Sequence, residues 1–138
     1  MTMRGLRIGF TLLAFVTAPA VALAGAGGTR VLVPGCAKAQ YKPRKLILGC
    51  DGSNYLKALT WTSWTAKRAT GSGINEVDDC TPDCASGHFH AYQASVTLSR
   101  PRRCAHLRHM VFRHIALTYG TDHPPGRPTD SGPLACPV

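Results

Sequence analysis

Two cysteines and two histidines stand close together, at Cys80, Cys84, His88 and His90. Thiolate sulfur and imidazole nitrogen are ligands of tetrahedral Zn²⁺, and two histidines one residue apart share one face of a strand. The alternative is a local Cys80–Cys84 disulfide in a loop that contains Pro82, with both histidines as polar strand positions. Export would favour the disulfide, because the extracellular compartment oxidises thiols, and we therefore predict no cofactor.

A basic segment extends from Arg100 to Arg113. It contains histidines at positions 106 and 109, and a further histidine follows it at position 114. Arginine forks match the oxygen geometry of phosphate and sulfate, so Arg102, Arg103 and Arg108 are candidate ligand-binding residues. The alternative is a solvated surface that serves solubility. A helix over residues 104–114 would make the first two histidines neighbours.

Aromatic residues gather at Tyr55, Trp61 and Trp64. Flat aromatic faces can pack on pyranose rings, so the three residues form a candidate sugar-stacking platform. In an extended strand, however, Trp61 and Trp64 point to opposite faces. At least one of them is then expected in the core, where aromatic rings contribute a large buried area.

Sequence signatures of catalysis are weak. The chain has no G-x-S-x-G elbow and no glycine-rich phosphate loop. Adjacent carboxylates such as Asp78 and Asp79 diverge on a strand and do not form an acid–base pair. No catalytic residue is therefore assigned, although His88, His90 and Asp83 would be the acid–base cluster of a small hydrolase.

The first 24 residues have the features of a secretory signal peptide. Arg4 and Arg7 precede an apolar run that ends in small residues at Ala24, which is typical of a cleaved leader. Pro19 interrupts this run, which disfavours a membrane anchor of about 20 apolar residues. We expect cleavage after Ala24 and a secreted, extracellular protein without a transmembrane anchor.

All six cysteines lie after this cleavage site, which predicts three disulfides in an exported chain. Sequence neighbours suggest the pairs Cys36–Cys50, Cys80–Cys84 and Cys104–Cys136. The net charge is +9, and it is +7 once Arg4 and Arg7 are removed with residues 1–24. Such a charge attracts anionic partners at long range.

The remaining chain is expected to form one β-rich domain over residues 45–138 with a proline-rich tail, preceded by a flexible lead-in over residues 25–44. Alternation of apolar and polar residues predicts strands from Phe89 to Leu98 and from Met110 to Tyr119. Short strands separated by Gly, Asp, Asn and Pro predict an all-β fold, a small antiparallel sandwich or barrel.

Residues 45–119 resemble a group of small secreted actinobacterial proteins. The shared signature is DGSNYLKALTWTSW followed by DCTPDCASGHFHAY, SVTLSRP and VFRHIALTY. Members of the group tend to place one residue between the first cysteine and the Asp-Gly turn, whereas Cys50 here directly precedes Asp51. The resemblance implies export and a β-rich disulfide domain, and it transfers no catalytic residue.

Together these features favour a non-enzymatic extracellular binding module. Its expected partner is an anionic polymer of the cell envelope or another secreted protein, with no specific nucleic acid. One alternative is the small hydrolase described above. Another is a secreted enzyme inhibitor that displays the loop of residues 75–88.

Overall fold

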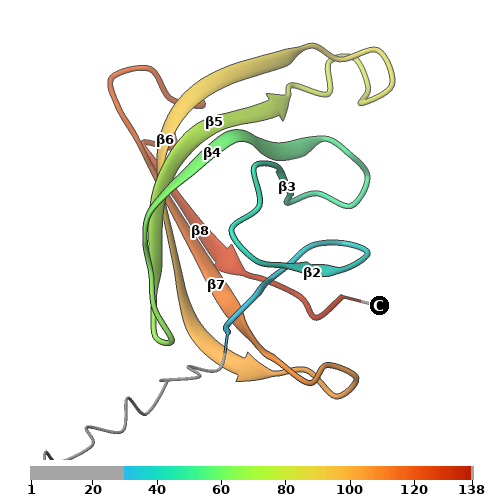
Figure 1. The fold of residues 1–138 in the computed structure, drawn as a ribbon. Helices are drawn as coiled ribbons and strands as arrows, with labels where there is room; N and C mark the ends of the chain where they lie inside the picture. Colours follow the sequence, from blue (N-terminus) through green and yellow to red (C-terminus); the bar gives the residue numbers. More distant parts are fainter. Residues whose placement is uncertain (1–29, 138) are drawn as a thin grey trace, which may run out of the picture.

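The computed structural model describes residues 30–137, and the expected signal peptide lies outside the described residues. The all-β prediction is confirmed: an antiparallel six-stranded sheet curls into a half-barrel (Figure 1), and three disulfides staple it. The strands are β1 (Val33–Pro34), β2 (Ala39–Gln40), β3 (Leu46–Ile47), β4 (Asn54–Trp64), β5 (Ala69–Asp78), β6 (Phe89–Arg103), β7 (Met110–Tyr119) and β8 (Thr129–Pro133).

The large sheet is a meander, since its strands pair in chain order from β3 to β8. On β6, Ala94, Val96 and Leu98 are buried while Gln93 and Ser95 are exposed, as the alternation predicts. β7 begins at Met110, which pairs with Arg103, so a helix over residues 104–114 is wrong. A hairpin turn occupies that place, in which the Leu107 amide donates to the Cys104 carbonyl at 3.0 Å.

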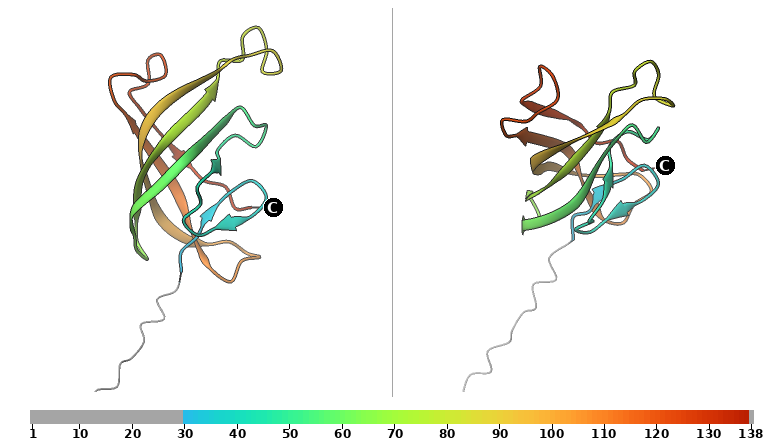
Figure 2. Two further views of the ribbon diagram at one scale, coloured as in Figure 1. Left: turned by 45° about the horizontal axis from the view of Figure 1, so that its top comes forward. Right: turned by 90° about the horizontal axis from the view of Figure 1, so that it is seen from above.

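The N-terminal segment, residues 30–48, lies on the concave side of the curled sheet (Figures 1 and 2). Val31 and Val33 are 3% and 0% exposed and belong to the main core cluster. The Leu32 amide donates to the Met110 carbonyl at 2.9 Å, and the Phe112 amide donates to the Leu32 carbonyl at 2.9 Å. Over its described part, the expected lead-in is therefore a packed element, because the apolar inner face of a half-barrel needs a cover.

β4 is bent by two irregularities in its pairing with β5, between Lys57 and Thr60 and between Trp61 and Ser63. Ala58 lies at the first of them with a φ of 50°. Gly73 on β5 accommodates the bend, since a Cβ there would lie 2.9 Å from the Lys57 carbonyl oxygen.

The second irregularity changes the direction of the tryptophan side chains. Trp61 and Trp64 lie on the same face, with ring centroids 4.7 Å apart and planes at 87°. The prediction of opposite faces was wrong because it assumed an unbroken period of two.

The three disulfides join Cys36 to Cys50, Cys80 to Cys84 and Cys104 to Cys136, the pairs suggested by sequence proximity. The proline-rich tail forms the edge strand β8 and then reaches Cys136. Within residues 30–137, no helix is long and apolar enough to cross a membrane.

Candidate anion-binding surface

Charge is divided between the two ends of the half-barrel. In an antiparallel meander the start of β4, the end of β5, the start of β6, the end of β7 and the start of β8 meet at one end. All seven carboxylates of the sequence lie there or in the loops beside it. They are Asp51, Glu76, Asp78, Asp79, Asp83, Asp122 and Asp130. We call this end the acidic end.

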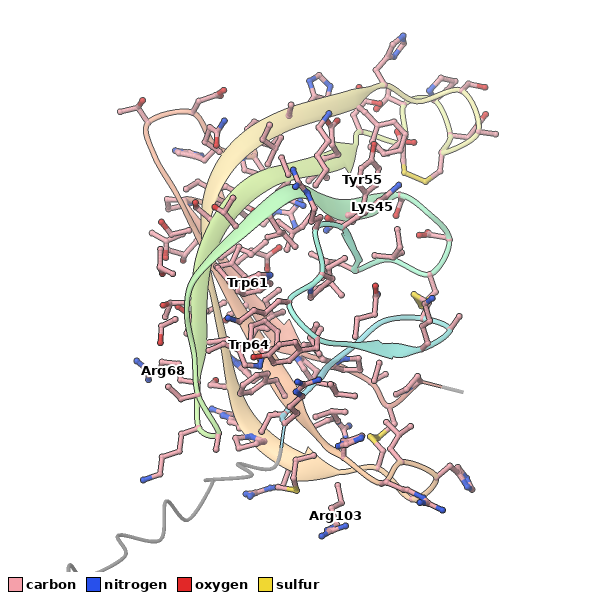
Figure 3. The ribbon with its side chains drawn as sticks, viewed as in Figure 1. Lys45, Tyr55, Trp61, Trp64, Arg68 and Arg103 are labelled. Carbon is pink, nitrogen blue, oxygen red and sulfur yellow. A yellow bond between two sulfur atoms is a disulfide. The ribbon has the colours of Figure 1, made fainter. Side chains whose placement is uncertain are left out.

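The opposite end carries exposed cations. The β4–β5 turn and the tip of the β6–β7 hairpin both lie at this end, and Figures 2 and 3 show them apart from each other on the same side of the molecule. The basic end comprises Lys67, Arg68, Arg100, Arg102, Arg103 and Arg108, all exposed. Because Ala69 pairs with Leu98, Arg68 lies beside the point where β6 leaves β5 and continues toward Arg103 paired with β7 only.

The β6–β7 hairpin is fixed at its base. The Cys104–Cys136 disulfide links it to the C-terminal segment, and Cys104 is 5% exposed. The Arg113 guanidinium on β7 reinforces the link: Nε donates to the Leu134 carbonyl at 2.6 Å and Nη1 contacts the Cys136 sulfur at 3.1 Å. Arg102 and Arg103 are therefore displayed by a braced strand end.

Within residues 30–137, no carboxylate forms an ion pair with a cation of the basic end. The ion pairs among residues 30–137 join Lys57 to Glu76, His90 to Asp79 and Arg127 to Asp130, so none involves the basic end. β5, with ten residues, separates the two ends by about 30 Å at roughly 3.3 Å per residue. Since exposed charges are screened beyond about 8 Å at physiological salt, the carboxylates cannot neutralise these cations.

The candidate sugar platform is not assembled. The Trp61 indole N–H donates to the Pro43 carbonyl at 2.9 Å, and that of Trp64 donates to the Val31 carbonyl at 2.8 Å. Both tryptophans therefore hold the N-terminal segment against the sheet. Tyr55 lies away from them (Figure 3), packed on Phe89 at 5.6 Å, with the Lys45 ammonium 4.4 Å above its ring.

The candidate zinc cluster is contradicted. Cys80 and Cys84 are joined in a disulfide, which removes both thiolates as metal ligands. No group of three or more His, Cys, Asp or Glu side chains in residues 30–137 could hold a metal ion. His88 and His90 flank Phe89 at the start of β6, where both are exposed.

The candidate hydrolase cluster is assembled differently from the sequence expectation. Asp83 accepts the backbone amides of Ala85 and Ser86, each at 2.9 Å, and so closes a turn within the loop. The carboxylate that contacts a histidine is Asp79, whose Oδ2 lies 3.1 Å from His90 Nε2. Sequence reasoning missed this partner because β6 returns antiparallel to β5 and brings His90 back to the end of that strand.

Asp79 also organises the base of the disulfide loop. Its Oδ1 accepts the amides of His88 at 3.0 Å and Thr81 at 3.1 Å. These contacts lower the pKa of Asp79 from 3.8 to about 2. The largest effect comes from the His88 amide, followed by the His90 side chain and the Thr81 amide. Hydrogen bonds that stabilise the carboxylate have this effect in general.

Protonation of the Asp79 carboxylate at acid pH should loosen the disulfide loop. A folded pKa below the unfolded one gives stability that is full above about pH 4 and is lost as the pH falls toward 2. We therefore expect the His88 amide to lose protection from hydrogen exchange across that window. In the Asp79→Asn variant the same amide should be weakly protected at every pH. Asp83→Asn is the control, and an identical acid profile in the Asp79→Asn variant would contradict the assignment.

Comparisons with known proteins add no family to this description. No family model, no curated protein and no solved structure matches the chain. The arrangement of side chains is therefore the basis for inferring function. Lys67 and Arg68 were not singled out in the sequence. Only the sheet topology shows that they join Arg102, Arg103 and Arg108.

Proposed function

We propose that the protein is a secreted, non-enzymatic binding module that holds an anionic polymer of the cell envelope at its basic end. The observation that carries the proposal is the segregation of charge, with six exposed cations at one end and every carboxylate at or near the other. None of these cations has an ion-pair partner among residues 30–137. Their charges therefore remain available to attract an anion from outside the molecule. The signal peptide expected at residues 1–24 supports an extracellular partner.

The composition of the basic end indicates the chemistry of the partner. Five of its six cations are arginines, whose planar forks bind phosphate, sulfate and carboxylate oxygens in pairs. The cations from Arg100 to Arg103 extend along a strand over roughly 10 Å, and Arg68 adds a contact from the neighbouring turn. A chain with repeated oxyanions can contact several of these side chains at once, whereas a single small anion cannot.

The test measures binding to polyphosphate, polygalacturonate and dextran sulfate, with neutral dextran as the uncharged polymer. We expect all three polyanions to bind with affinities that fall as salt rises, and dextran not to bind. The triple variant R102Q/R103Q/R108Q should bind about 10- to 100-fold more weakly, from three exposed charge contacts at roughly 0.5–1 kcal/mol each.

The matched control is K38Q/R44Q/K45Q, which removes the same charge from the exposed surface of the N-terminal segment. It should retain most of the affinity. Equal losses in both variants would mean that net charge alone drives binding, which contradicts a defined basic end. Depolymerisation of a bound polymer by the pure protein would contradict the non-enzymatic assignment, and tighter binding to duplex DNA than to the three polymers would contradict the envelope partner.

A further inference from the structure

An open cleft of about 350 Å³ lies at the acidic end, between the strand ends of β5 and β6 and the β7–β8 loop. Small-molecule sites commonly occupy the mouths of β-barrels at about this size. The cleft is separated by the length of the sheet from the basic end, so its ligand need not be the polymer proposed above. Its lining combines flat apolar surfaces with paired polar groups.

The apolar lining includes Tyr92 on β6 and Pro124 and Pro125 in the β7–β8 loop. Tyr92 is held by an edge contact with Tyr119, whose ring centroid lies 6.1 Å away at 73°. The Tyr119 hydroxyl in turn donates to the buried Asn75 Oδ1 at 2.8 Å. The Tyr92 ring is therefore part of a fixed wall, and such rings present a flat apolar face.

The charged groups that line the cleft are Asp78, Asp79, His90 and Arg127. Asp78 accepts the Cys80 amide at 2.9 Å, while His90 and Arg127 each lie next to a carboxylate. His90 Nε2 lies 3.1 Å from Asp79 Oδ2, and Arg127 Nη1 lies 3.8 Å from Asp130 Oδ2 across a loose, exposed ion pair. Imidazole and guanidinium nitrogens donate hydrogen bonds and carboxylates accept them. Each pair thus presents a donor next to an acceptor, which suits a hydroxyl group because a hydroxyl both donates and accepts.

Charge balance narrows the ligand class further. The carboxylates of Asp78 and Asp79 in the lining repel polyanions, while the Arg127 guanidinium offsets part of their attraction for an amine. A neutral ligand can form hydrogen bonds with these groups without charge repulsion. Flat apolar walls together with side-by-side donors and acceptors match a pyranose ring, which has an apolar C–H face and a rim of hydroxyls.

We infer that this cleft binds a neutral saccharide unit, with the ring packed on Tyr92 and its hydroxyls bonded by His90, Asp79 and Arg127. This site is independent of the proposed function, since it shares no residue with the basic end. It replaces the platform expected at Tyr55, Trp61 and Trp64, where the tryptophans are occupied in packing.

The experiment titrates maltotetraose, cellotetraose and N-acetylchitotetraose into the isotopically labelled protein and follows amide chemical shifts. At least one sugar should shift the amides of Tyr92, His90 and Arg127 with millimolar affinity, and the effect should persist at high salt. Arg127→Gln should weaken binding at least threefold, and Tyr92→Ala should abolish it. Gln93→Ala, an exposed change beside the cleft residue Tyr92 on β6, should have no effect.

Tyr92→Ala can also lower stability through the lost contact with Tyr119, so Arg127→Gln in an exposed loop is the decisive variant. Absence of shifts at the three cleft residues with all three sugars would overturn the inference. Shifts unaffected by Arg127→Gln, or cleft shifts caused by spermidine and not by the sugars, would also overturn it. R102Q/R103Q/R108Q should leave sugar binding unchanged, which separates this result from that of polymer binding.

Discussion

Trp64→Ala is expected to lower the free energy of unfolding by about 3 kcal/mol, the lower range for loss of a large aromatic side chain. The Trp64 ring contacts three other aromatic rings, those of Tyr41 at 5.3 Å, Trp61 at 4.7 Å and Phe112 at 5.6 Å between centroids. Its indole N–H also satisfies the carbonyl of the buried Val31. Loss of the ring therefore removes the contact by which β4 holds Val31 and Tyr41 of the N-terminal segment.

Chemical denaturation measures the loss, and hydrogen exchange locates it. The amides of Leu32 and Phe112 bond across the junction of the N-terminal segment and β7, so both should exchange faster in Trp64→Ala. Trp64→Phe keeps a ring and loses the hydrogen bond, for which we expect about 1 kcal/mol. Unchanged protection at Leu32 and Phe112 in Trp64→Ala would show that the tryptophan does not dock the segment.

Removal of the Cys104–Cys136 disulfide, as C104A/C136A, is expected to cost about 3–4 kcal/mol. This bridge closes a loop with a sequence separation of 32, and the chain entropy of the unfolded state rises with the logarithm of that length. The same change frees the base of the hairpin that carries Arg108. Polyanion binding should weaken although no charge is lost, because the arginines are then less well ordered before binding.

The matched control is C80A/C84A, whose bridge spans a separation of only 4. The same entropy relation gives about 2 kcal/mol for that loop, and polyanion affinity should not change because the loop lies at the acidic end. Thermal unfolding and a binding titration on both variants give the comparison. Equal effects on affinity would contradict the role of the Cys104–Cys136 bridge in positioning the basic end.

Local patterns in the sequence predict much of this fold. The alternation from Phe89 to Leu98 matches the buried and exposed faces of β6, because a half-buried strand repeats every two residues. The Pro and Gly content of residues 120–128 similarly separates β7 from β8. The disulfide pairs follow sequence proximity because a meander places neighbouring segments side by side.

Other features depend on contacts distant in sequence. The direction of Trp64 depends on an irregularity set by the pairing of β4 with β5, and no local pattern marks it. The burial of Val31 depends on an uncovered concave face that exists only after the sheet curls. A short apolar run after small residues can therefore resemble a lead-in and yet belong to the core.

The candidate sites were the least predictable feature. Asp79 and His90 are eleven residues apart in the chain and meet only across a pair of strand ends. Arg68 and Arg103 share one end of the molecule because β4, β5, β6 and β7 alternate in direction. Composition reports the net charge, but the positions of charges relative to one another follow from topology.

The separation of charge along β5 also gives the molecule a large electric dipole moment. Near a negatively charged surface, the field exerts a torque that turns the basic end inward and the acidic end outward, before any contact forms. The protein therefore arrives in one orientation instead of many. In that orientation the cleft beside Tyr92 opens toward the surrounding medium, so a surface-bound molecule keeps this cleft accessible to soluble ligands.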